Sequence, residues 1–114
     1  MAGLAPIPPA ADARVGAVFA ALADPTRRHL VEALAAEPGA TATRLAADLP
    51  ISRQAVAKHL TTLGAAGLIS SRRSGREIKF ELQARPLADA AGWIAAVGSE
   101  WDGRLERLRG LLAG

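Results

Sequence analysis

The sequence predicts a mainly helical fold that carries one small β-hairpin. Aromatic residues make up only 4% of the 114 residues, alanine is abundant, and apolar residues recur at helical spacing along most of the chain. This composition favours closely packed helices over a large sheet. The spacing of apolar residues changes from helical to alternating once, between residues 68 and 82, where two short extended runs flank a Ser-Gly pair. That pattern is typical of a tight hairpin.

The length allows a single domain. We expect a short arm over residues 1–11, which hold three prolines, and one folded domain over residues 12–114. No positive charge precedes Arg14, so the start does not resemble a secretion signal. No apolar run approaches the ~20 residues that a membrane span needs. A cytoplasmic protein without a membrane partner is therefore the expectation.

Start and stop signals define the first two helices. The spacing of apolar residues predicts a helix over about residues 11–23. Asp24 can then cap a second helix, and Pro25 suits its first position because proline lacks the amide proton that is unpaired there. This second helix is expected to run to about Ala36, before a Glu-Pro-Gly stop.

Two further helices are separated by a turn that contains Pro50. Thr41 can cap a short third helix that ends near Leu49, and Ser52 can cap a fourth helix that runs to about Ala65. The extended runs 68–73 and 76–82 follow, joined at Ser74-Gly75, and a last helix is expected over residues 87–112. Helix, short helix, turn, helix and hairpin is the order of a winged helix-turn-helix.

The fourth helix has two chemically different faces. Val56, Leu60 and Leu63 share one side, which we expect to be buried. The opposite side carries groups that suit base edges and phosphates. We predict that this side contacts DNA through Ser52, Arg53, Gln54, Ala57, Lys58 and Thr61. An ordinary solvated helix face is the alternative for these residues.

Positive charge is concentrated in the same part of the chain. Residues 51–80 contain six basic residues and one acidic residue, a local excess of five positive charges against +3 for the whole chain. Four of these cations flank the predicted hairpin turn, where a wing could lie along the DNA backbone. They are Arg72, Arg73, Arg76 and Lys79. Protection of an edge hairpin against aggregation would explain one or two of them, but less easily four.

The stretch from residue 21 to residue 82 resembles the ArsR/SmtB family of bacterial repressors. The matching pieces are DPTRR (24–28), ISRQAVAKHL (51–60), LGAAGLI (63–69) and SGRE (74–77). The resemblance implies a winged helix-turn-helix repressor that binds a palindromic operator, often at its own promoter, and leaves DNA when an effector binds. It also implies an obligate homodimer whose interface is formed by the first and last helices.

The last helix carries a wide apolar stripe that fits such an interface. A ligand pocket around Trp93 and Trp101 is the alternative, and the two interpretations are compatible. The interface residues that we predict are Val18, Phe19, Trp93, Ile94, Val97, Trp101, Leu105, Leu108 and Leu112.

The chain departs from the metal-sensing members of this family. It has no cysteine, and its last helix has no histidine. We therefore expect no metal site and no cofactor, and we place the chain in the branch without metal-binding cysteines. The sequence does not indicate whether a small-molecule effector exists or what it is. The alternative function is a winged-helix protein-interaction module without a DNA role.

Several residues allow more than one interpretation. Arg27 and Thr43 are candidates for DNA-backbone contacts, and Glu32 is the alternative partner for the cations at the start of the second helix. His59 lies beside the core face, where a structural role is expected rather than a catalytic or metal-binding one. The chain lacks a cysteine nucleophile, a glycine-rich phosphate loop and paired carboxylates near a histidine. No catalytic residue is therefore expected.

Overall fold

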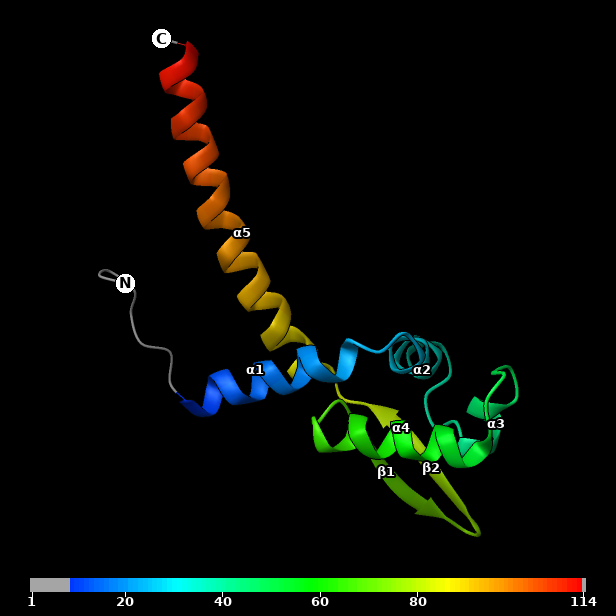
Figure 1. Ribbon diagram of the computed structural model, residues 1–114. Helices are drawn as coiled ribbons and strands as arrows, with labels where there is room; N and C mark the ends of the chain where they lie inside the picture. The colour runs from blue at the N-terminus through cyan, green and yellow to red at the C-terminus, as the bar shows by residue number, and fades with distance from the viewer. Residues whose placement is uncertain (1–8, 114) are drawn as a thin grey trace.

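The computed structural model describes residues 9–113, with side chains from residue 13 onward. Over these residues the order of elements agrees with the predicted winged helix-turn-helix (Figure 1). The elements are α1 (Pro9–Leu22), α2 (Pro25–Ala36), α3 (Ala42–Ala46), α4 (Arg53–Ala65), β1 (Ile69–Ser74), β2 (Glu77–Leu82) and α5 (Ala84–Ala113).

Three helices begin at the caps that the sequence predicts. The Asp24 carboxylate accepts a hydrogen bond from the Arg27 amide at 3.0 Å, and Pro25 occupies the first turn of α2. The Thr41 and Ser52 hydroxyls each accept an amide hydrogen bond at 3.1 Å, at the starts of α3 and α4. Each cap satisfies one of the amides that a helix start leaves unpaired, which fixes where these helices begin.

The Asp24 cap makes the stability of the fold depend on pH. The hydrogen bond from the Arg27 amide holds the pKa of Asp24 below its ordinary value, and the positive charges of His59 and Arg27 act in the same direction. A carboxyl group with a lowered folded-state pKa stabilises the fold above its unfolded pKa, and this contribution is lost as the pH falls through the folded pKa. We expect the melting temperature to drop between about pH 5 and pH 2. The Asp24→Asn variant, which can still cap, should show a smaller drop, and an equal drop would contradict this role.

The core lies between α1, α2, α4 and the base of the hairpin. Its most deeply buried large side chains are Val18, Leu30, Leu34, Val56, Leu63 and Leu68. The predicted core face of α4 is confirmed, because Val56, Leu60 and Leu63 are all buried.

A cavity in this core should be costly. Leu34 is fully buried within the cluster, so Leu34→Ala is expected to lower the free energy of unfolding by about 2–5 kcal/mol. Urea denaturation would measure the change. Glu32→Ala, on the exposed side of the same helix, should change stability by less than about 0.5 kcal/mol. A similar cost for both variants would contradict the assignment of the core.

The hairpin turn lies one residue later than predicted. Strands β1 and β2 pair in antiparallel register from Ile69 opposite Leu82 to Ser74 opposite Glu77. The two-residue loop is therefore Gly75-Arg76 and not Ser74-Gly75. Gly75 has φ +63°, a value that suits the first position of a two-residue hairpin loop and that glycine adopts without strain. The turn follows the position of this glycine, which is why Ser74 stays in β1.

The link between α2 and α3 adds a short extended segment to the hairpin. The Gly39 amide donates to the Phe80 carbonyl at 2.8 Å, and the Phe80 amide donates to the Ala40 carbonyl at 3.0 Å. Gly39 has φ +85°, so the chain can leave the end of α2 and turn directly onto β2. These bonds hold the hairpin against the short helix α3.

The bounds of three helices, α1, α3 and α5, differ from the predictions. Helix α3 ends at Ala46 rather than near Leu49, and α5 is longer than predicted, because it begins at Ala84 and ends at Ala113. Helix α1 begins at Pro9, so residues 9–11 of the expected arm are helical, while residues 1–8 of that arm lie outside the described residues.

Helix α5 extends away from the rest of the molecule. It crosses α1 near its own start, and its C-terminal half projects beyond every other element (Figure 1). The described part of the chain accordingly measures 67 × 30 × 20 Å. No helix within residues 9–113 is both long enough and apolar enough to cross a membrane.

Candidate DNA-binding surface

Helices α3 and α4 present the face on which the sequence places base contacts. Ser52 and the first turns of α4 are exposed, with Arg53, Gln54, Ala57 and Lys58 all open to solvent. Because α4 buries its other side, these groups share the outer side of one rigid element. The predicted division of the helix into a core face and an open face is therefore confirmed.

Thr43 and Arg53 come together across the turn between α3 and α4. An Nη1 hydrogen of Arg53 is directed to the Thr43 hydroxyl at 3.4 Å, and both side chains are exposed. This bond leaves the rest of the guanidinium group free to meet an acceptor. The structure thus places two of the predicted DNA contacts side by side at the start of α4.

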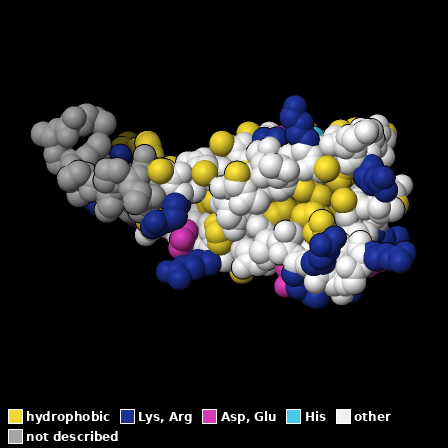
Figure 2. Space-filling view, turned by 90° about the horizontal axis from the view of Figure 1, so that it is seen from below, with side chains coloured by type: hydrophobic (Ala, Val, Ile, Leu, Met, Phe, Trp, Pro, Cys, Tyr) yellow, Lys and Arg dark blue, Asp and Glu magenta, His cyan; other side chains and the backbone are white. Residues whose placement is uncertain are grey.

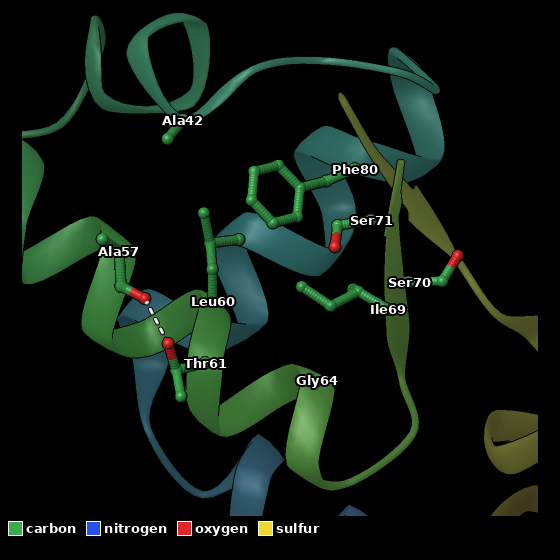
Figure 3. A pocket seen from close by; sticks show the side chains of 9 residues that line it. All are labelled: Ala42, Ala57, Leu60, Thr61, Gly64, Ile69, Ser70, Ser71 and Phe80. Carbon is green, nitrogen blue, oxygen red and sulfur yellow. Dashed lines mark hydrogen bonds between the residues drawn. The ribbon is translucent and has the colours of Figure 1, made fainter. Parts of the chain in front are cut away.

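Thr61 is exposed farther along the same face. Its hydroxyl donates to the Ala57 carbonyl at 3.0 Å, one turn earlier (Figure 3). With this proton used inside the helix, Thr61 offers its methyl group and the remaining lone pair to a ligand, and it is not a free donor.

A groove runs between α4 and the hairpin. One part, with a volume of about 310 Å³, has an apolar floor on which Leu60, Ile69 and Phe80 converge (Figure 3). Ser71 faces this hollow, whereas Ser70 points away from it. The adjoining part, of about 590 Å³, is lined by residues from four segments. Its lining comprises Thr41, Ala42, Thr43, Arg53, Ala57, Arg76, Glu77, Ile78 and Phe80.

Positive side chains surround this groove. The face that carries α4 and the hairpin shows a central apolar patch with Lys and Arg side chains around it (Figure 2). Arg53 from α4 and Arg76 from the hairpin loop line the same part of the groove. An apolar floor with a cationic rim matches a partner that carries negative charge around less polar surfaces, as a nucleic acid does.

The four predicted wing cations separate onto different sides of the hairpin. Neighbouring residues of a strand point to opposite faces, so Arg73 shares a face with Phe80, and Arg72 shares the other face with Lys79. Arg72 is also engaged, because its Nε lies 3.2 Å from a carboxylate oxygen of Glu81. Arg73 and Arg76 are therefore better placed to serve this groove than Arg72 and Lys79.

Ile78 of β2 is an apolar residue that lies on the surface. Its alternation with Glu77 and Lys79 predicts a core position, yet its side chain is 52% exposed and lines the groove. Near its tip the hairpin extends past the helices, and no core remains for Ile78 to enter. The closeness of Ile78 to the turn is the one sequence signal that could have indicated this.

Arg27, a candidate for a DNA-backbone contact, is engaged with carbonyl groups inside the protomer. Its Nε donates to the Ala21 carbonyl at 2.6 Å, and its Nη2 donates to the Ala20 carbonyl at 3.2 Å. Arg28 donates to the Leu22 carbonyl at 2.6 Å. Cations are favourable near the carbonyl end of a helix, so within this protomer these arginines bond to the last carbonyls of α1 rather than to Glu32.

His59 has the half-buried position that the sequence predicts. Its Nδ1 lies 3.4 Å from an Nη1 of Arg27 and 4.0 Å from a carboxylate oxygen of Asp24. It therefore joins a polar contact between α4 and the start of α2. Among the described residues, no group of three or more potential metal-ligating side chains comes together.

The apolar stripe of α5 is open along most of its length. Trp101 is 56% exposed and Leu108 is 52% exposed, and Trp93, Ile94, Leu105 and Leu112 are likewise exposed. Phe19 of α1 contacts Trp93 edge to face, with 5.6 Å between the ring centroids. Leu111, which the predicted interface omits, is 80% exposed. The exposed apolar residues of α5 form the α5 stripe, and apart from the Phe19–Trp93 contact most of this apolar surface is open to solvent in the described protomer.

The prediction for Val18 is wrong. Its side chain is only 1% exposed and belongs to the core of its own protomer. Successive residues of a helix are rotated by about 100°, so Val18 faces the core while Phe19 faces α5. Val18 cannot offer surface to a second chain.

The comparisons with known proteins agree with this architecture. Residues 22–72, which span α2 to β1, match the family model described as "Helix-turn-helix domain". The transcriptional repressor SdpR of Bacillus subtilis is 35% identical over 77 residues, which cover 68% of this chain and 84% of the repressor. An ArsR-like transcriptional regulator from Rhodococcus sp. RHA1 superimposes with a TM-score of 0.77 at 39% identity, over 90% of this chain and 95% of the regulator.

The chain belongs to the ArsR family of helix-turn-helix transcriptional regulators. This ArsR-family regulator also resembles a winged helix-turn-helix DNA-binding domain from Mycobacterium bovis that is described as homodimeric. The identity is 25% and the TM-score 0.64, over 94% of this chain and 95% of that domain. The sequence of the regulator contains no cysteine.

Proposed function

We propose that this regulator is a homodimeric repressor that binds a palindromic operator, including one at its own promoter. Helix α4 would enter the major groove, and the hairpin would lie along the adjacent backbone. The observation that carries the proposal is the groove between α4 and the hairpin, with Arg53 and Arg76 on its rim. Residue types on the outer face of α4 support it, because Arg can pair with guanine and Gln with adenine.

The role of each side chain follows from its position. Arg53 and Gln54 stand in the first turn of α4, where they would meet base edges beside Thr43. Ser52, Ala57 and Thr61 would complete the contact along the helix. Lys58 is exposed one turn on, and we propose that it contacts phosphate. In the wing, Arg73 and Arg76 would contact the DNA. Arg72 and Lys79 would add to the positive electrostatic potential of the hairpin without direct contact.

The homodimer would form through the α5 stripe together with Phe19. A row of exposed tryptophan and leucine side chains on one helix is unfavourable in water, and burial against a second copy would remove that cost. The homodimeric state of the Mycobacterium bovis domain supports this assembly. A symmetric dimer would present two α4 helices to two half-sites about 34–36 Å apart.

The signal that releases the repressor from DNA would not be bound by cysteine thiolates, because the chain has none. We propose a function without catalysis, in which promoter occlusion is the whole mechanism. Any effector would act by changing the relative placement of the two α4 helices in the dimer.

The test is binding of the purified protein to DNA from upstream of its own gene. A mobility-shift titration with nonspecific competitor should give a specific complex. Its affinity should fall steeply as salt rises from 50 to 200 mM, by about 10³-fold if six phosphates are contacted. If upstream DNA fails, selection from random duplexes should recover a palindrome. Failure of both with a folded dimer would favour the protein-interaction module.

A further inference from the structure

An open hollow lies between helix α1 and the end of helix α4. Its volume is about 300 Å³, and it is lined by small residues. Its walls are Ala17, Ala20 and Ala21 on α1, and Thr62, Ala65 and Ala66 near the end of α4, with Arg27 at its edge. Close packing normally fixes the angle between two helices. At this hollow the alanine side chains supply few contacts that could fix the angle between α1 and α4.

The side chain of Arg27 spans this gap. Two of its nitrogens donate to the Ala20 and Ala21 carbonyls at the end of α1, and the third approaches Nδ1 of His59 on α4 at 3.4 Å. The planar guanidinium group holds these donors in one fixed geometry. One side chain from α2 therefore connects the end of α1 to the middle of α4.

We propose that Arg27 and His59 are positioning residues that set the angle of α4 relative to α1 and thereby the spacing of half-sites that the dimer accepts. This inference rests on the proposed function, since α1 and α5 would fix the dimer axis and α4 would read the half-site. A small change in this angle displaces both reading helices in a symmetric dimer. The bridge that Arg27 and His59 form between α1 and α4 therefore affects the preferred distance between half-sites more than the contact with a single half-site.

The contact between Arg27 and His59 depends on which ring nitrogen of His59 carries a proton. Nδ1 can accept the hydrogen bond from Arg27 only when it carries no proton. Protonation would turn this atom into a donor and place two cations side by side. Asp24, whose carboxylate lies 4.0 Å from Nδ1, is the one acid in contact with it among the described residues. Lys58 is its neighbour on α4, Arg28 is bonded to the end of α1, and the α1 wall of the hollow is alanine.

The experiment measures the affinity of the protein for the operator recovered by selection and for copies whose spacer is longer or shorter by one base pair. The spacing ratio is the affinity for the native spacer divided by the affinity for an altered spacer. One base pair turns a half-site by about 35° around the DNA axis. We expect the wild-type protein to prefer the native spacing by about tenfold or more, and Arg27→Lys and His59→Leu to reduce this ratio to about threefold or less. The double variant should lose no more than either single variant, because both break one bridge.

Two controls separate positioning from stability. Arg28→Lys changes an arginine that also bonds to the end of α1 but does not reach α4, so it should keep the wild-type spacing ratio. His59→Gln keeps a neutral acceptor, so it should keep the ratio as well.

The outcomes distinguish the two proposals. If the wild type does not distinguish the operator from scrambled DNA, the proposed function fails and this inference fails with it. If the wild type binds the operator specifically while Arg27→Lys keeps its full spacing preference, only the inference fails. An equal loss in Arg28→Lys and Arg27→Lys would assign both arginines to general stability and would also overturn the inference.

Discussion

Replacing Arg53 by alanine is expected to lower affinity for the operator by about five- to 150-fold, equivalent to about 1–3 kcal/mol. Arg53 stands in the first turn of α4 and lines the groove beside the hairpin, and its one side-chain hydrogen bond among residues 9–113 is to Thr43 at 3.4 Å. Its guanidinium group can therefore turn to guanine without breaking a strong contact. The loss should be concentrated at one base position, where the variant should tolerate all four bases.

Lys58→Ala is the matched control, since it also removes one exposed cation from α4. We expect Lys58→Ala to weaken binding to all sequences. The slope of log affinity against log salt concentration should become shallower by about one unit, because about one counterion fewer is released. Both variants can be titrated by fluorescence anisotropy against the operator and a set of single-base changes. An Arg53→Ala protein that keeps the parental base preference would show that α4 does not read sequence through this residue.

The second large effect is expected in the α5 stripe. Trp101 and Leu105 are 56% and 50% exposed on the half of α5 that projects from the protomer. In a dimer, glutamate at both positions would place charges in an apolar interface, which is strongly unfavourable. The variant with Trp101→Glu and Leu105→Glu should therefore be monomeric. Its affinity for a two-half-site operator should fall by about a hundredfold or more, because one reading unit is lost.

Light scattering during size-exclusion chromatography would measure the mass, and circular dichroism would show that the helices persist. The control carries Ala95→Glu and Ser99→Glu, which add the same charge to exposed positions on the opposite side of α5. It should remain dimeric and bind the operator. A dimeric Trp101→Glu, Leu105→Glu variant would place the interface elsewhere.

Local chemistry was enough to predict much of this regulator. The caps at Asp24, Thr41 and Ser52 depend on side chains that bond to amides three residues away. The two faces of α4 follow from the helical period alone. These features can be inferred from sequence because each involves residues within one or two turns of each other.

Features that join distant segments could not be inferred in the same way. Arg27 bonds to α1 and approaches His59, which is 32 positions later in the chain. Arg72 is paired with Glu81, and Ile78 is exposed because the hairpin extends beyond the helices. No period or motif encodes these partners.

The order of the elements, their caps and the polar face of α4 follow from local sequence, because local hydrogen bonds and periodicity control them. Which side chains stay exposed and unbonded depends on tertiary packing. Because neighbouring helices pack against one another, the side chain of Val18 is buried in the core and the side chain of Arg27 bonds to the end of α1. A residue's partners depend on the surfaces that folding brings together, and those surfaces come from remote parts of the chain.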